Sequence, residues 1–214
     1  MSLKWKVCGM RESQNIKDVL ALKPNYLGFI FYAQSKRFAD EVLDKKLLAS
    51  FPDTTEKVGV FVNADEPYIR DKVAKYGLEM LQLHGTESPE FCQKLRTDHL
   101  KVMKAFAIDE SFDFTCIAPY VETCDYFLFD TKAPSGYGGH GKKFDWTLLD
   151  HYKDDVPFLL AGGIDLESIA KVKALEHPVF MGIDVNSKFE QSPALKDVGM
   201  LKLLKKELTG NIVD

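Results

Sequence analysis

Short apolar segments recur along the chain, about one for every strand–helix unit. They read KWKVCG, YLGFIF, KVGVFV, MLQLHG, VMKAFA, YFLFD, FLLAGG and VFMGID. Most are apolar throughout and do not alternate with polar residues, which is typical of parallel strands covered on both faces. Their separation along the chain fits a strand followed by a helix better than a hairpin.

The segments between these strands carry helical patterns of apolar residues. Ser88 followed by Pro89 has the form of a helix cap with proline at the first helical position. The weakest helical patterns are residues 109–120, which Pro119 interrupts, and a short stretch that starts near Asp145. The last helix is expected to carry Val198, Leu201, Leu204 and Leu208 on one face.

Eight strands alternating with helices predict either a (β/α)8 barrel or a doubly wound sheet. No G-x-G-x-x-G motif follows the first strand, which weakens the dinucleotide-binding alternative. The strand count and the length of 214 residues favour a single (β/α)8 TIM barrel over residues 1–214. The glycine-rich stretch SGYGGHG, residues 135–141, is expected to be one mobile loop of that domain and a candidate to close over a substrate.

Charge and composition narrow the class of protein further. The net charge is −4 and no Lys/Arg run is present, which argues against nucleic-acid and anionic membrane partners. The four cysteines form no C-x-x-C pair, so they are expected to be reduced thiols of a cytoplasmic protein. The five histidines show no metal-ligand spacing, and no metal is predicted. The chain is expected to be a monomer.

Polar or reactive residues end most of the predicted strands. In a barrel of this kind the chemistry lies at the C-terminal ends of the strands. These positions hold Cys8, Arg37, Asn63, His84, Asp130, Gly162, Gly163, Asp184 and Asn186. Such an arrangement favours an enzyme over a scaffold.

Two late loops predict a phosphate site. LAGGI, residues 160–164, offers backbone N–H groups without a side chain in the way, and DVNS, residues 184–187, adds further donors. The loops after the last two strands of a barrel often hold a phosphate group. From the residues alone, a tight turn explains Gly162 and Gly163 equally well.

Seven segments in order resemble one family, the phosphoribosylanthranilate isomerases of tryptophan biosynthesis. They are KVCGM (6–10), GFIF with SKR (28–31, 35–37), VGVFVN (58–63), LQLHG (81–85), FDT with GGHGKKFDW (129–131, 138–146), LAGGI (160–164) and DVNSKFE (184–190). The resemblance implies a (β/α)8 barrel without cofactors. The implied reaction converts N-(5-phosphoribosyl)anthranilate to 1-(2-carboxyphenylamino)-1-deoxyribulose 5-phosphate by an Amadori rearrangement.

The resemblance also implies roles for particular residues. Cys8 would be the general base and Asp130 the general acid, while Arg37 would hold the anthranilate carboxylate. Substrate phosphate would bind at Gly162, Gly163, Asn186 and Ser187, and Asp184 is either a substrate contact or a structural carboxylate. A cysteine base must act as the thiolate, and the free thiol pKa of about 8.5 would need lowering by a cation or by backbone dipoles.

Two positions depart from the family pattern. Lys188 stands where the family usually has glycine, and His140 where it usually has threonine. Lys188 could crowd the phosphate loop or add a charge to it.

Other interpretations remain for the same residues. A lone cysteine at a strand end is more often a core residue than a catalyst, Asp130 could cap the next loop, and Arg37 could be a solvated charge. The alternative functions are another phosphosugar aldose–ketose isomerase, in which two aspartates normally form the acid–base pair, and a non-catalytic barrel that binds a phosphorylated ligand.

Overall fold

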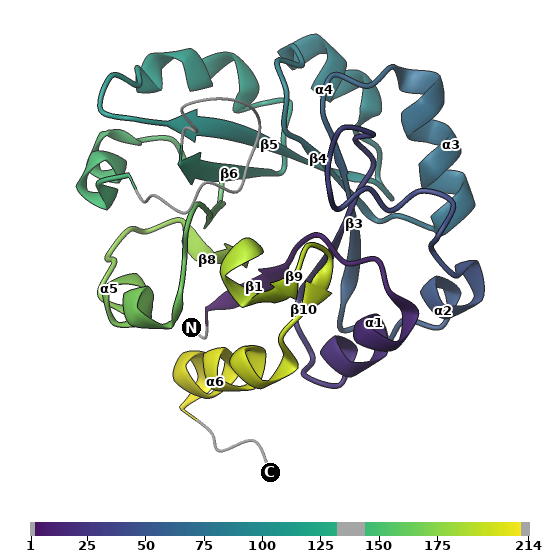
Figure 1. Cartoon of the computed structure of the whole chain (residues 1–214). Helices are drawn as coiled ribbons and strands as arrows, with labels where there is room; N and C mark the ends of the chain where they lie inside the picture. The colour runs from purple at the N-terminus through teal and green to yellow at the C-terminus, as the bar shows by residue number, and fades with distance from the viewer. Residues whose placement is uncertain (1–2, 132–143, 211–214) are drawn as a thin grey trace.

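The computed structural model describes residues 3–131 and 144–210. Its eight parallel strands close into a barrel in chain order, with β1 paired to β8 (Figure 1). The strands are β1 (Lys4–Val7), β2 (Tyr26–Ile30), β3 (Glu56–Phe61), β4 (Met80–Leu83), β5 (Lys101–Ile108), β6 (Tyr126–Thr131), β7 (Phe158–Leu160) and β8 (Phe180–Val185). The predicted barrel is confirmed. The glycine-rich loop, residues 135–141, with His140, lies outside the described residues.

Helices surround the barrel and connect its strands (Figure 1). The α-helices are α1 (Ser13–Leu20), α2 (Lys45–Ala49), α3 (Glu66–Tyr76), α4 (Pro89–Leu95), α5 (Ile169–Lys173) and α6 (Val198–Thr209). The Ser88 side chain caps α4 by accepting from the N–H of Phe91, with Pro89 in the first turn, as predicted. None of the helices in the described ranges combines the length and apolar character needed to cross a bilayer.

The two weak helical patterns form 3-10 turns instead of α-helices. They are η1 (Phe114–Tyr120), which contains Pro119, and η2 (Trp146–His151). Proline removes a donor and clashes with the preceding turn, so a tighter and shorter helix is favoured there. Two more 3-10 turns, η3 (Leu166–Ser168) and η4 (Ser187–Phe189), follow β7 and β8.

A small antiparallel hairpin follows η4 and was not predicted. It consists of β9 (Glu190–Ser192) and β10 (Leu195–Lys196). Asn15 of α1 fastens it, because its amide donates to the carbonyl of Lys196 and accepts from the N–H of Lys196. The hairpin carries two charged side chains to the edge of the barrel, Glu190 and Lys196.

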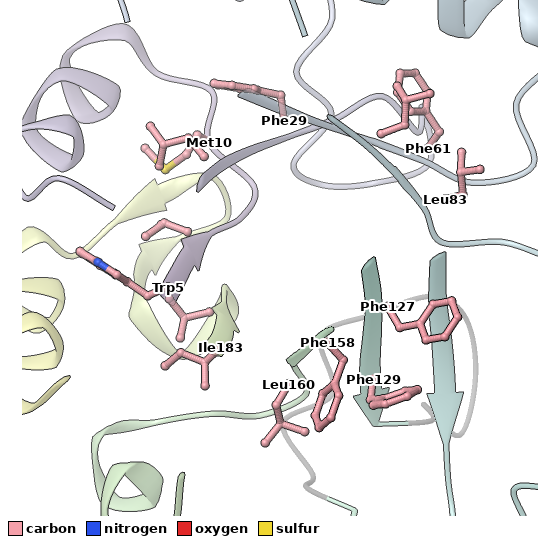
Figure 2. Packing of buried hydrophobic residues seen from close by; sticks show 14 of the residues in the cluster. Trp5, Met10, Phe29, Phe61, Leu83, Phe127, Phe129, Phe158, Leu160 and Ile183 are labelled. Carbon is pink, nitrogen blue, oxygen red and sulfur yellow. The ribbon is translucent and has the colours of Figure 1, made fainter. Parts of the chain in front are cut away.

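The two faces of each strand serve different purposes. One face packs against the surrounding helices and is apolar, with Trp5, Phe29, Phe61, Phe127 and Phe129 among its buried residues (Figure 2). Successive strand residues point to opposite faces, so the alternate residues point into the barrel. A smaller apolar cluster fills part of that interior, including Tyr26, Met80, Met103, Leu128 and Leu159.

The interior face is polar nearer the C-terminal ends of the strands. Lys6, Gln82 and Asp184 are buried there on β1, β4 and β8. This polar layer is a finding of the structure, because the sequence does not show which strand residues point into the barrel. It lies beneath the residues that end the strands.

Candidate active site

One cavity of about 740 Å³ opens at the C-terminal ends of the strands. Its lining includes the eight residues to which a catalytic or binding role was assigned from the sequence: Cys8, Arg37, Asp130, Gly162, Gly163, Asp184, Asn186 and Ser187. Of the other strand-end residues, His84 lines the cavity and Asn63 does not. Barrel closure brings these residues together, because each follows or ends a parallel strand and all eight strands end at the same rim. A second cavity, of about 640 Å³, lies between η2 and α5 and contains none of the eight.

Cys8 is the first residue after β1. Its N–H donates to the carbonyl of Val185, which extends the β1–β8 pairing by one residue. Only 4% of the residue is exposed. Burial raises the pKa of the Cys8 thiol, the ammonium groups of Lys6 and Lys196 lower it, and Asp184 raises it. Burial therefore favours the neutral thiol, and the two nearby cations favour the thiolate.

Beneath Cys8 lies a buried ion pair. Lys6 and Asp184 are register partners across the β1–β8 seam, and Lys6 Nζ lies 2.7 Å from Asp184 Oδ2. The other carboxylate oxygen of Asp184, Oδ1, is buried and has no hydrogen-bond partner among the described residues. Because Asp184 also lines the cavity, this oxygen is an acceptor available to a polar group of a bound ligand.

Asp130 on β6 faces a histidine. Its Oδ2 lies 3.4 Å from Nε2 of His84, which follows β4. The Gln82 amide nitrogen lies 2.8 Å from His84 Nδ1. If that amide donates to Nδ1, the proton of neutral His84 is on Nε2 and points to Asp130. His84 therefore links Gln82 of β4 to Asp130 of β6.

The guanidinium of Arg37 is held by the carboxylate of Glu190, which belongs to the β9–β10 hairpin. Its Nε and Nη2 lie 2.9 Å and 2.7 Å from the two carboxylate oxygens of Glu190. Glu190 Oε1 also lies 2.6 Å from the ammonium of Lys196, which in turn lies 2.6 Å from Asn186 Oδ1. Burial lowers the pKa of Lys196 to about 8, although Glu190 raises it. The network fixes Arg37 and Asn186 on the same side of the cavity.

The glycine loop after β7 has a left-handed backbone conformation at both glycines. Gly162 and Gly163 have φ angles of 88° and 66°, a region that favours glycine. Among the described residues, no acceptor receives the N–H groups of Gly162, Gly163 or Ser187. Lys188 is exposed at the cavity wall, and its φ is not positive, so the backbone does not require glycine there.

Four side chains of the site were missed by sequence reasoning: Lys6, Gln82, Glu190 and Lys196. Lys6 and Gln82 interrupt apolar strands, and a polar residue inside such a strand was the available signal. Glu190 belongs to the matched segment DVNSKFE, so its motif could have drawn attention to it. Lys196 lies in the unpredicted hairpin and carried no signal.

Comparison with known proteins gives consistent results. Residues 5–207 match the family model described as N-(5′-phosphoribosyl)anthranilate (PRA) isomerase. A relative from Parabacteroides distasonis, named N-(5′-phosphoribosyl)anthranilate isomerase, is 48% identical over 198 residues, which cover 92% of this chain and 89% of the relative.

Solved structures agree with the sequence relatives. The crystal structure of phosphoribosyl anthranilate isomerase from Thermotoga maritima matches with a TM-score of 0.86 at 31% identity, covering 98% of this chain and 100% of that chain. A phosphoribosyl anthranilate isomerase in complex with reduced 1-(o-carboxyphenylamino)-1-deoxyribulose 5-phosphate matches with a TM-score of 0.80 at 26% identity, covering 98% and 100%. With the family model and the relative at 48% identity, these matches show that the chain belongs to the N-(5′-phosphoribosyl)anthranilate isomerase family.

Proposed function

We propose that this protein catalyses the Amadori rearrangement of N-(5′-phosphoribosyl)anthranilate in tryptophan biosynthesis, with Asp130 as general acid and Cys8 as general base. The observation that carries the proposal is that a thiol and a carboxyl group end β1 and β6 and line one cavity in a chain of this family. The product is 1-(2-carboxyphenylamino)-1-deoxyribulose 5-phosphate.

The reaction needs an acid first and a base second. Asp130 gives its proton to the ribose ring oxygen, the ring C–O bond breaks, and a protonated imine forms between C1 and the anthranilate nitrogen. The Cys8 thiolate then removes the proton from C2, and the electron pair of that C–H bond moves toward the imine to give an enolamine. The enolamine loses its hydroxyl proton and gains a proton at C1, which gives the ketone.

Three groups would hold the substrate during these steps. Arg37 would bind the anthranilate carboxylate through the guanidinium nitrogen that Glu190 leaves available, since Glu190 engages Nε and Nη2. The N–H groups of Gly162, Gly163 and Ser187 would bind the phosphate, with Asn186 beside them. Asp184 Oδ1 would accept a hydrogen bond from a sugar hydroxyl.

A fluorescence assay tests the function and the two catalytic roles together. N-(5′-phosphoribosyl)anthranilate is generated in the cuvette, and its anthranilate-like emission is followed for the parent, Cys8→Ser and Asp130→Asn. We expect rapid loss with the parent and rates lower by several orders of magnitude in both variants. A folded parent without turnover would refute the function, and a variant with nearly full rate would refute the role of the residue changed.

We also propose a monomer in the cytoplasm, as expected from the sequence. The support for a monomer is that Val42 and Leu203 are the large exposed apolar residues of the described chain, and single exposed apolar residues are normal for monomers. The four cysteines are free, which fits a reducing compartment. Light scattering on the eluting protein checks the oligomeric state, because a mass near 24.2 kDa is expected and twice that mass would contradict it.

A further inference from the structure

Lys6 is a fully buried lysine in a strand whose neighbouring residues are apolar. Its relative exposure is 0%, and it has the same strand face as Cys8, two residues later. Burial of an ammonium group costs several kcal/mol unless it is paired and hydrogen-bonded. An apolar side chain would fill the barrel at this position without that cost, so the buried charge of Lys6 indicates a further role.

The ammonium of Lys6 lies between two acidic groups. On one side, Nζ lies 2.7 Å from Asp184 Oδ2. On the other side lies the thiol of Cys8, which together with Asp184 raises the pKa of Lys6. Gly28 on β2 makes room for both groups: a Cβ at this glycine would lie 2.9 Å from Cys8 Sγ and 3.1 Å from Lys6 Nζ. The thiol and the ammonium thus share one small space over the Gly28 backbone.

From this geometry we propose that Lys6 is a positioning residue whose buried ammonium stabilises the Cys8 thiolate, while Asp184 holds the ammonium in place. The inference rests on the proposed role of Cys8 as base. Lys6 supplies the cation that a thiolate base requires. When Cys8 takes the C2 proton, the thiol becomes neutral and the Lys6–Asp184 pair stays balanced, so no unpaired charge is left buried.

Other charged groups also face Cys8 or its cavity and must be counted. They are Asp184 on β8, Lys196 on β10, Arg37 after β2 with its partner Glu190 on β9, Asp130 on β6, His84 after β4, and Lys36 and Lys188 on the cavity wall. Burial opposes the charge of Lys6, but Asp184 and Cys8 outweigh it, so the pKa of Lys6 is raised. Lys6 therefore stays protonated when the thiol ionises. A residue must stay charged in this way to act as the counter-ion of a thiolate. Among the charges near Cys8, Lys6 has the largest influence, and it lowers the thiol pKa.

The test is the pH dependence of Cys8 alkylation by iodoacetamide, measured by mass spectrometry of the Cys8 peptide. The readout reports the thiolate directly and requires no turnover. Cys116→Ser is the common background, because Cys116 is the exposed cysteine. The informative variants are Lys6→Met and the double variant Lys6→Met/Asp184→Asn. The double variant removes both charges of the pair and leaves no unpaired buried charge, so it remains testable if Lys6→Met fails to fold.

We expect Lys6→Met to lower the alkylation rate at pH 7 about tenfold or more and to move the pH midpoint up by about one unit. The double variant should shift in the same direction by a smaller amount, because it also removes the charge of Asp184, which raises the thiol pKa. Lys4→Met is the matched control. It removes a lysine from the same strand face at the far end of β1 and should leave the profile unchanged. A double variant with the parent's profile would overturn the inference, as would a control that shifts equally.

Turnover measured on the same variants separates this inference from the proposed function. A lower kcat, with its rise at alkaline pH moved upward by the same amount as the alkylation midpoint, supports both. A shifted alkylation profile in a protein whose parent has no isomerase activity supports the Lys6–Cys8 pairing and refutes the function. An active parent with an unshifted double variant refutes only the role of Lys6.

Discussion

Glu190 grips the guanidinium of Arg37 at two points, with Nε 2.9 Å from Oε1 and Nη2 2.7 Å from Oε2. The two residues are 153 positions apart in the chain. Two parallel contacts define both the position and the plane of the guanidinium, which a single contact would not. Glu190 therefore sets the orientation in which Arg37 faces the cavity.

Replacement of Glu190 by glutamine should weaken substrate binding more than chemistry. The amide keeps one acceptor and loses the charge that pairs with Arg37 and Lys196, so we expect KM to rise about tenfold with kcat changed less than threefold. Steady-state kinetics with the fluorescence assay measures both. Glu12→Gln is the matched control, since Glu12 pairs with Arg11 at an exposed site. A fall in kcat at unchanged KM would contradict the role.

His84 should support the proton donor and not the binding of substrate. Once Asp130 has given up its proton, the carboxylate can accept from the Nε2–H of His84, 3.4 Å away in the free protein. We expect His84→Leu to lower kcat by about tenfold to a hundredfold with KM nearly unchanged, the range for a hydrogen bond to a charged group. The exposed His99, changed to leucine, is the control. An unaltered kcat in the His84 variant would exclude the pairing.

Lys188 should add a cation to the end of the cavity at which we propose that phosphate binds. The side chain is exposed beside Asn186 and Ser187, and its backbone does not demand glycine. An exposed charge acts weakly and is screened by salt. We expect Lys188→Gly to raise KM about threefold at low salt and to reduce the rise of KM with added KCl. If the variant instead lowers KM at every salt concentration, Lys188 crowds the loop.

The ionised Asp40 carboxylate should make the free energy of unfolding depend on pH. The Lys72 and Lys75 ammonium groups lie 2.8 Å and 3.0 Å from its carboxylate, and the Tyr76 hydroxyl donates to it at 2.8 Å. Burial raises the pKa of Asp40, but these donors outweigh it and hold the pKa well below its usual range. Because the pKa of Asp40 is lower in the folded than in the unfolded protein, its ionised form stabilises the fold. This stabilisation is complete above the pKa of an unfolded aspartate, about 3.9, and is lost as the pH falls through the pKa of Asp40 in the folded protein.

Asp40→Asn should therefore lower the free energy of unfolding by about 1 kcal/mol at pH 7, with a difference that shrinks below pH 4. Urea unfolding at several pH values between 3 and 7 measures this. Asp53→Asn, at an exposed position, should match the parent throughout. A constant difference between parent and Asp40→Asn down to pH 3 would show that the carboxylate is not stabilised by its neighbours.

The strand count, the barrel and most residues at its rim were predictable from the sequence alone. Eight apolar segments at the spacing of strand–helix units leave few closed arrangements, and in a parallel barrel every strand ends at the same side. The start of α4 was equally predictable, because the cap by Ser88 depends on a residue only three positions away and Pro89 follows it directly. Contacts between residues that are close in the chain can be predicted from the sequence, because the local backbone conformation fixes their distance.

Only the tertiary structure decided which polar side chains meet. The pairing of Lys6 with Asp184 spans 178 positions and depends on the register at which β1 closes against β8. Glu190 and Lys196 contact the cavity residues Arg37 and Asn186 through a hairpin that the apolar pattern of the sequence did not predict. The physical reason is that spacing along a strand tells which face a residue occupies, whereas its neighbours on that face follow from the register of the closed sheet.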